Sequence, residues 1–158
     1  MSAEKPFNPL DKKNLGIAIA EELSNQATTR LDQLTSFDGS GIYALYYTGH
    51  FPAYKTIAEL NSGVDVVQPI YVGKSGAPGG RKGQENSKNE RLLYTRIRTH
   101  RRNIEEVENL ETSEFFVKRL IVDDIFIPLG ERLMIASYSP MWNVYVDGFG
   151  NNAPGGNR

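Results

Sequence analysis

The chain has 158 residues, of which 39% are hydrophobic and 23% are charged, as is ordinary for one globular domain with a substantial core. It contains no cysteine, which excludes disulfide bonds, cysteine-based zinc sites and cysteine nucleophiles. No apolar run approaches the roughly 20 residues of a membrane span. The N-terminus lacks the apolar core of an export signal, so we expect a cytoplasmic protein with no membrane partner.

The charge is distributed unevenly along the chain. Although the net charge is −1, residues 74–102 hold nine lysines and arginines against two glutamates, a local balance of +7 that leaves the remainder near −8. A basic segment on an acidic body is typical of a protein that binds a polyanion. The alternative is a solvated basic helix face beside a basic loop.

The first half of the chain predicts helices followed by two strands. Residues 1–8 form an expected loose arm, and apolar residues at helical spacing predict one or two helices over 9–36, with Asn8 as the cap. Two runs rich in β-branched and aromatic residues, 41–47 and 69–73, predict buried strands. The glycine-, serine- and lysine-rich segment that follows predicts a flexible loop, where functional residues often lie.

The second half predicts two long helices and a third strand. Helical spacing predicts a helix over 89–102 and a further short helix over 103–110. A bulky apolar run predicts a strand over 114–122. Residues 128–138 are apolar nearly all round and predict a buried helix, which the Ser-Pro pair after it ends. Strands and helices mixed in this way indicate an α+β fold.

Five side chains on these elements are candidate site residues. A buried phenol needs a hydrogen-bond partner, and Tyr43 and Tyr71 lie on the two predicted strands. Arg96 and His100 are four residues apart, so they share one helix face at the border of the apolar stripe. Glu131 lies on an apolar face, where a carboxylate is costly unless it is paired or binds a metal. Each group also has a purely structural explanation. The tyrosines could be ordinary core residues, and the arginine could extend its charged end to water beside a histidine whose hydrogen bonds are made within the protein. The glutamate could be an acid in the first helical turn that the helix dipole favours.

Two triplets and four later residues form an ordered set. The triplets are GIY at 41–43 and YVG at 71–73. The later residues are Arg96, His100, Glu131 and Asn143. In this order and on these elements the set resembles the GIY-YIG nuclease superfamily, with valine replacing the commoner isoleucine in the second triplet. Within the superfamily the chain is similar to the type II restriction endonucleases that cut the palindrome CCGCGG.

The resemblance implies a small three-stranded, mostly antiparallel sheet flanked by helices, with an added N-terminal helix and loop insertions. The expected single domain has an N-terminal arm and helices over 1–37, a nuclease core over 38–145 and a flexible tail over 146–158. The two tyrosines are 28 residues apart, farther than in many members, which fits the restriction-enzyme branch. Related enzymes continue past the asparagine, which suggests a truncated piece or a short relative.

The resemblance also implies hydrolysis of phosphodiester bonds with one Mg²⁺, for which Mn²⁺ can substitute, giving 5′-phosphate and 3′-hydroxyl ends. Glu131 is the expected metal ligand, and Arg96 is the expected cation on the phosphate. Tyr43 is the expected general base, made more acidic by nearby cations. His100 could instead relay the proton from it, and the sequence leaves both possibilities open. Two further residues are expected to position water, phosphate or the metal shell: Tyr71 and Asn143.

Binding of double-stranded DNA is expected from the basic segment. Arginine reads guanine through two hydrogen bonds in the major groove, which suits a G·C-rich palindrome. A palindromic target calls for two-fold symmetry and therefore for a homodimer. The predicted DNA contacts are Lys74, Arg81, Lys82, Arg98, Arg101 and Arg102.

Three alternatives to a restriction endonuclease remain open at this point. The first is a DNA-binding module that has lost cleavage, and the second is a repair- or homing-type nuclease of the same superfamily. The third is a two-metal nuclease built on Asp123 and Asp124. That arrangement usually has a lysine two places after a nearby acid, and none follows Asp123.

Overall fold

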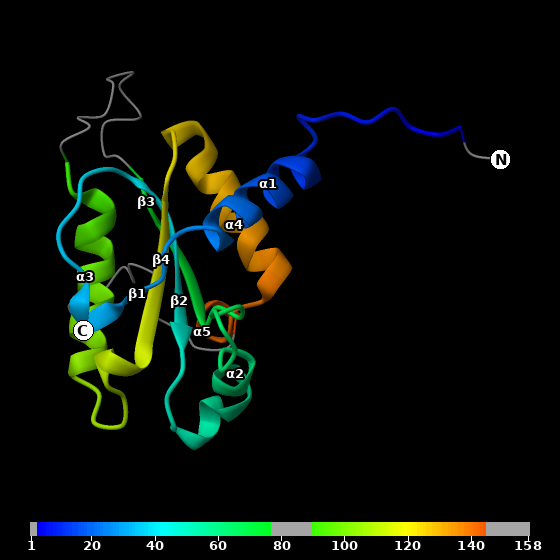
Figure 1. Ribbon diagram of the computed structural model, residues 1–158. Helices are drawn as coiled ribbons and strands as arrows, with labels where there is room; N and C mark the ends of the chain where they lie inside the picture. Colours follow the sequence, from blue (N-terminus) through cyan, green and yellow to red (C-terminus); the bar gives the residue numbers. More distant parts are fainter. Residues whose placement is uncertain (1–2, 77–89, 145–158) are drawn as a thin grey trace.

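The computed structural model describes residues 3–76 and 90–144. Within them lie four strands: β1 (Thr29–Arg30), β2 (Gly41–Tyr47), β3 (Tyr71–Ser75) and β4 (Phe115–Ile121). They form one antiparallel sheet in the order β1-β4-β2-β3, so β3 lies at an edge (Figure 1). The α+β class and the antiparallel sheet are confirmed, and the sheet has one strand more than the three expected.

Helices cover both faces of this sheet. Helix α3 (Leu92–Glu105) covers one face, and α1 (Lys12–Ser24) and α4 (Ile127–Tyr138) pack together on the other (Figure 1). The short helix α2 (Lys55–Leu60) lies beyond the end of β2, and the short helix α5 (Met141–Val144) lies beside β3 (Figure 1). Short 3₁₀ turns connect these elements: η1 (Leu31–Gln33), η2 (Pro52–Tyr54), η4 (Thr112–Glu114) and η5 (Asp124–Phe126).

Strand β2 organises the core because all seven of its residues are buried. Side chains alternate along a strand, so Tyr43, Leu45 and Tyr47 enter the core beneath α3, and the residues between them enter the core beneath α1 and α4. Burial on both faces explains why the strand reads as a continuous apolar run. Gly41 begins the strand where an added Cβ would collide with the carbonyl oxygen of Leu120 in β4.

The expected helices over 9–36 are only partly correct. Helix α1 begins at Lys12, and Asp11 rather than Asn8 caps it, because the Asp11 side chain accepts a hydrogen bond from the backbone N–H of Lys13. The helix ends at Ser24, and the chain then forms β1 and η1. Strand β1 pairs with β4, a tertiary interaction that outweighs the helical spacing of the leucines.

Two expectations for the later helices are wrong. No separate helix spans 103–110, because α3 runs through Asn103 to Glu105 and its buried stripe ends with Ile104. Helix α4 is not buried all round, since only Ile127, Gly130 and Met134 are fully buried. One face of α4 packs on the sheet and α1, and the opposite face is open to solvent.

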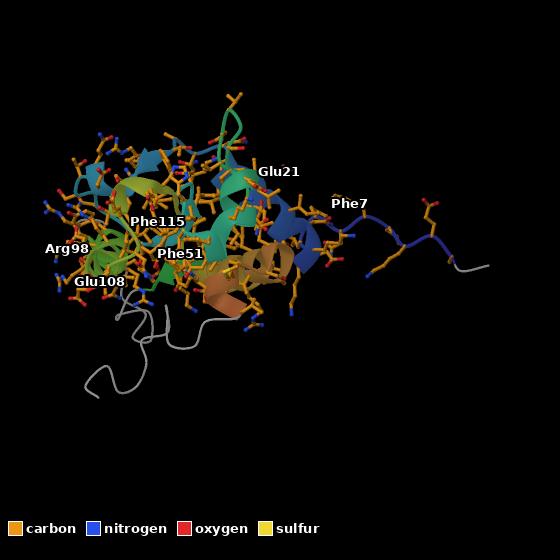
Figure 2. All side chains as sticks on the ribbon, turned by 90° about the horizontal axis from the view of Figure 1, so that it is seen from below. Phe7, Glu21, Phe51, Arg98, Glu108 and Phe115 are labelled. Atoms are coloured by element: carbon orange, nitrogen blue, oxygen red, sulfur yellow. The ribbon has the colours of Figure 1, made fainter. Side chains whose placement is uncertain are left out.

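The residues before α1 extend away from the body. Phe7 on this segment is 78% exposed and stands apart from Phe51 and Phe115 in the main body (Figure 2). Among the described residues, no helix has the length and apolarity required to cross a membrane. The expected tail, 146–158, and the loop residues 77–89 lie outside the described residues.

Candidate active site

The two tyrosines meet between β2 and β3. Tyr43 lies opposite Gly73 in the antiparallel register, and the rings of Tyr43 and Tyr71 have centroids 5.9 Å apart. A Cβ added at Gly73 would lie 2.6 Å from both Cζ and Oη of Tyr43. The glycine of the second triplet therefore leaves the space that the phenol of the first triplet occupies.

Helix α3 brings Arg96 and His100 to the same place. The His100 ring lies 4.5 Å from the Tyr71 ring and 5.8 Å from the Tyr43 ring, measured between centroids. The histidine is fully buried. Arg96 is half-buried at the border of the apolar stripe, and its charge and a side-chain hydrogen bond from it favour a lower pKa of the Tyr71 hydroxyl. The i, i+4 spacing on one helix face thus places both groups against the tyrosines, as predicted.

Glu131 approaches the same cluster from the other face of the sheet. It lies on α4, and its Oε1 is 3.3 Å from Nζ of Lys74 on β3. Lys74 points to the α4 side because it pairs with Ile42, whereas Tyr71 and Gly73 point to the α3 side. The candidate site therefore wraps around the edge strand β3 and draws on both faces of the sheet.

Burial controls the protonation of the ring side chains. Burial raises the pKa of Tyr43 well above its usual value of 10, with Tyr71 and Glu131 adding to the effect and Arg96 opposing it. Burial also raises the pKa of Tyr71, against the opposing charge of Arg96. Burial and the neighbouring Arg96 lower the pKa of His100 to about 3. At pH 7 both phenols keep their protons and the imidazole is neutral, which differs from the expected acidified Tyr43.

Asn143 holds the edge strand in place. Its Oδ1 accepts a hydrogen bond of 2.8 Å from the backbone N–H of Val72, and its Nδ2 donates one of 2.8 Å to the carbonyl oxygen of Val72. The amide thus satisfies the outward backbone groups of the residue next to Tyr71. This contact positions the tyrosine strand, and a contact of Asn143 with metal or phosphate stays a prediction.

Three of the predicted DNA contacts lie away from this cluster. Arg98 and Arg102 are exposed on the outer side of α3, where Arg98 is seen at the periphery (Figure 2). Arg101 pairs with Glu105 at 3.4 Å, and its charge adds slightly to the hydrogen bond from Arg30 that lowers the pKa of Asp32 in η1. Lys74 lies at the cluster itself. Two others, Arg81 and Lys82, fall outside the described residues.

Arg119 was not among the site residues predicted from the sequence. This residue of β4 lies opposite Tyr43 in the register and so projects on the same face of the sheet. Its guanidinium carbon is 3.8 Å from the ring centroid of Phe37, which packs edge-on against Tyr94 of α3. Counting by twos from the buried residues Phe115 and Val117 could have placed this arginine on the tyrosine face.

A magnesium ion at this site would have Glu131 as its carboxylate ligand. Among residues 3–76 and 90–144, no group of three potential His, Cys, Asp or Glu ligands comes together. Glu131 offers one carboxylate, and Mg²⁺ commonly takes one or two carboxylates and completes its shell with waters and substrate oxygens. Asp124 accepts a hydrogen bond from Ser40 at 3.2 Å, Asp123 precedes η5, and within the described ranges no third ligand joins these two aspartates.

Comparison with protein families agrees with this arrangement. The family model described as the Eco29kI GIY-YIG domain matches residues 35–158, a range that includes both triplets and the four later residues of the ordered set. No curated protein shows a significant match to the chain. The chain belongs to the Eco29kI restriction endonuclease family of GIY-YIG nucleases, and DNA is its substrate.

Proposed function

We propose that the protein is a type II restriction endonuclease that hydrolyses phosphodiester bonds within a G·C-rich palindrome, CCGCGG being the expected site. The observation that carries the proposal is the convergence of Tyr43, Tyr71, His100 and Arg96 with Glu131, from opposite faces of one sheet, around the edge strand β3. On this strand Lys74 is the exposed residue, so we expect DNA to approach the site on the side of Lys74.

Glu131 would hold one Mg²⁺, or Mn²⁺ in its place. When bound, the ion supplies positive charge to the scissile phosphate and to the leaving oxygen. The half-buried guanidinium of Arg96 would bind the same phosphate with its planar fork of donors. Because a side-chain hydrogen bond links it to Tyr71, the guanidinium would be held in position before the substrate arrives.

The attacking water needs a proton acceptor, and the candidate groups are Tyr43 and His100. Tyr43 is a neutral phenol whose hydroxyl can accept the proton of the water only as it releases its own. The ring of His100 packs against both tyrosines, but burial and Arg96 lower its pKa to about 3, so it would take the released proton only when the anionic phosphate of bound DNA raises that pKa. Tyr71 would orient the water or the phosphate, and Asn143 would keep Tyr71 in position through β3.

Two copies of the chain would bind the palindrome as a two-fold symmetric homodimer in the cytoplasm. The exposed arginines of α3 lie on the flank away from Arg96, so they would contact the duplex at some distance from the scissile bond. Arg119 lies on the tyrosine face and is a further candidate for a phosphate contact.

The test is digestion of a plasmid of known sequence with Mg²⁺, followed by mapping of the ends. Cleavage at CCGCGG with 5′-phosphate and 3′-hydroxyl ends supports the full proposal, and cleavage at another palindrome corrects its specificity. Scattered or single-strand nicking would point to a repair- or homing-type nuclease. Retention of DNA without any cutting would point to a binding module, and Tyr43→Phe is the matched inactive control in every case.

A further inference from the structure

The expected metal ligand already has a cationic partner. Nζ of Lys74 lies 3.3 Å from Oε1 of Glu131. The Lys74 side chain is 41% exposed and the Glu131 side chain 21% exposed. The lysine is thus the more solvent-accessible partner, able to rotate into water, whereas the carboxylate is held on α4 near both tyrosines.

A lysine and a divalent cation compete for one carboxylate. Among the described residues Glu131 belongs to no group of three acidic, histidine or cysteine ligands, and its negative charge is neutralised while the ammonium remains. A dication beside that carboxylate would stand roughly 5 Å from the ammonium, and even in water their repulsion corresponds to about a tenfold loss of affinity.

We propose that Lys74 is a counter-ion that opposes metal binding until DNA takes over its ammonium. When a DNA phosphate reaches the edge of β3, it offers Lys74 a new partner and leaves the Glu131 carboxylate available to the cation. Metal and DNA then bind cooperatively, and by thermodynamic reciprocity each increases the affinity for the other. This inference rests on the proposed function, because it takes Glu131 as the metal ligand.

The first test measures metal binding without DNA and without catalysis. Free Mn²⁺ is titrated by electron paramagnetic resonance against the full chain, Lys74→Met, and the matched control Lys55→Met. Lys55 is also an exposed lysine paired with a glutamate, Glu59, at 3.9 Å, but it lies on α2. Lys74→Met should bind Mn²⁺ about tenfold more tightly than the wild-type chain, whereas Lys55→Met should bind it with unchanged affinity. Equal affinity in all three proteins, or weaker binding by Lys74→Met, would overturn the counter-ion role.

The second test measures the coupling to DNA. In a Tyr43→Phe background, which prevents cutting, saturating duplex should tighten Mn²⁺ binding, and the added substitution Lys74→Met should reduce that gain about tenfold. An unchanged gain would refute the transfer of Lys74 to phosphate.

Glu131→Gln separates the two proposals. If it binds Mn²⁺ as tightly as wild type, the metal ligand itself is misassigned and the proposed function must change. If it loses Mn²⁺ while Lys74→Met shows no gain, only the counter-ion inference fails.

Discussion

Replacing Gly73 with alanine tests whether the position of the Tyr43 hydroxyl controls cleavage. The added Cβ would lie 2.6 Å from Cζ and Oη of Tyr43 and 2.7 Å from Cε1 of Tyr71. Carbon atoms in normal contact are roughly 3.5–4.0 Å apart, so at least one buried ring must move by about 1 Å. Both rings are rigid and almost completely buried, which leaves little room for the shift.

Two consequences follow from this collision. Overpacking of a buried site costs about 1–3 kcal/mol of unfolding free energy, which should appear in urea denaturation. A misplacement of a reacting group by about 1 Å can cost about 10²-fold in rate, which should appear in single-turnover cleavage at saturating protein and Mg²⁺. Gly63→Ala is the matched control, because a Cβ at Gly63 meets nothing within 4 Å. That variant should cut and unfold as wild type does.

The double variant with Tyr43→Phe identifies the mechanism of the loss. If Gly73→Ala acts by displacing the Tyr43 hydroxyl, it should add little to the defect of Tyr43→Phe, because both changes disable one group. A Gly73→Ala protein that is less stable but cuts at the wild-type rate would refute the reasoning. Fully additive losses would also refute it, since they would mean that the glycine serves another part of the site.

Three other predictions concern the metal ligand, the histidine and the asparagine. At saturating Mg²⁺, Glu131→Gln should abolish cutting and Asp123→Ala should not, and a loss confined to the aspartate variant would revive the two-metal alternative. The pKa of His100 is about 3 in the folded chain and near 6.5 when unfolded, so below pH 6.5 the unfolded state binds more protons. Stability should fall by about 2–3 kcal/mol between pH 7.5 and 4.5 in urea titrations, and an equally steep fall in His100→Gln would contradict this assignment. Asn143→Ala loses both bonds to Val72 and should lower stability by about 1–3 kcal/mol with an unchanged Mg²⁺ dependence of cleavage. A shifted Mg²⁺ dependence would instead favour direct contact with the metal shell.

Local pattern predicted the elements that are buried along one continuous stripe or run. The strand over 41–47 coincides with β2, and Leu93, Ile97 and Ile104 are all fully buried in α3. These predictions succeeded because burial on fixed sides requires a fixed spacing of apolar residues. Strand β1 was missed because two residues give no periodic signal, and it exists only through pairing with β4.

In the candidate site, too, local spacing predicted some features and tertiary contacts determined the others. The order of its residues along the chain was sufficient for the family, and the i, i+4 spacing placed Arg96 beside His100. Because side chains alternate along a strand, Lys74 and Tyr71 point to opposite faces of the sheet. From the sequence, Lys74 was predicted only as a DNA contact. No local pattern indicated that this lysine would meet Glu131, because the two residues are 57 positions apart and approach across the α4 face of β3.

By itself, the sequence determined which chemical groups are present and on which elements they lie. Only the tertiary structure determined the pKa values of these groups, because desolvation depends on everything packed around a group rather than on its neighbours in the chain. Burial beneath α3 raises the pKa of Tyr43, and burial together with Arg96 lowers the pKa of His100 to about 3. The pairing of Glu131 with Lys74 was likewise decided when α4 folded onto the edge strand.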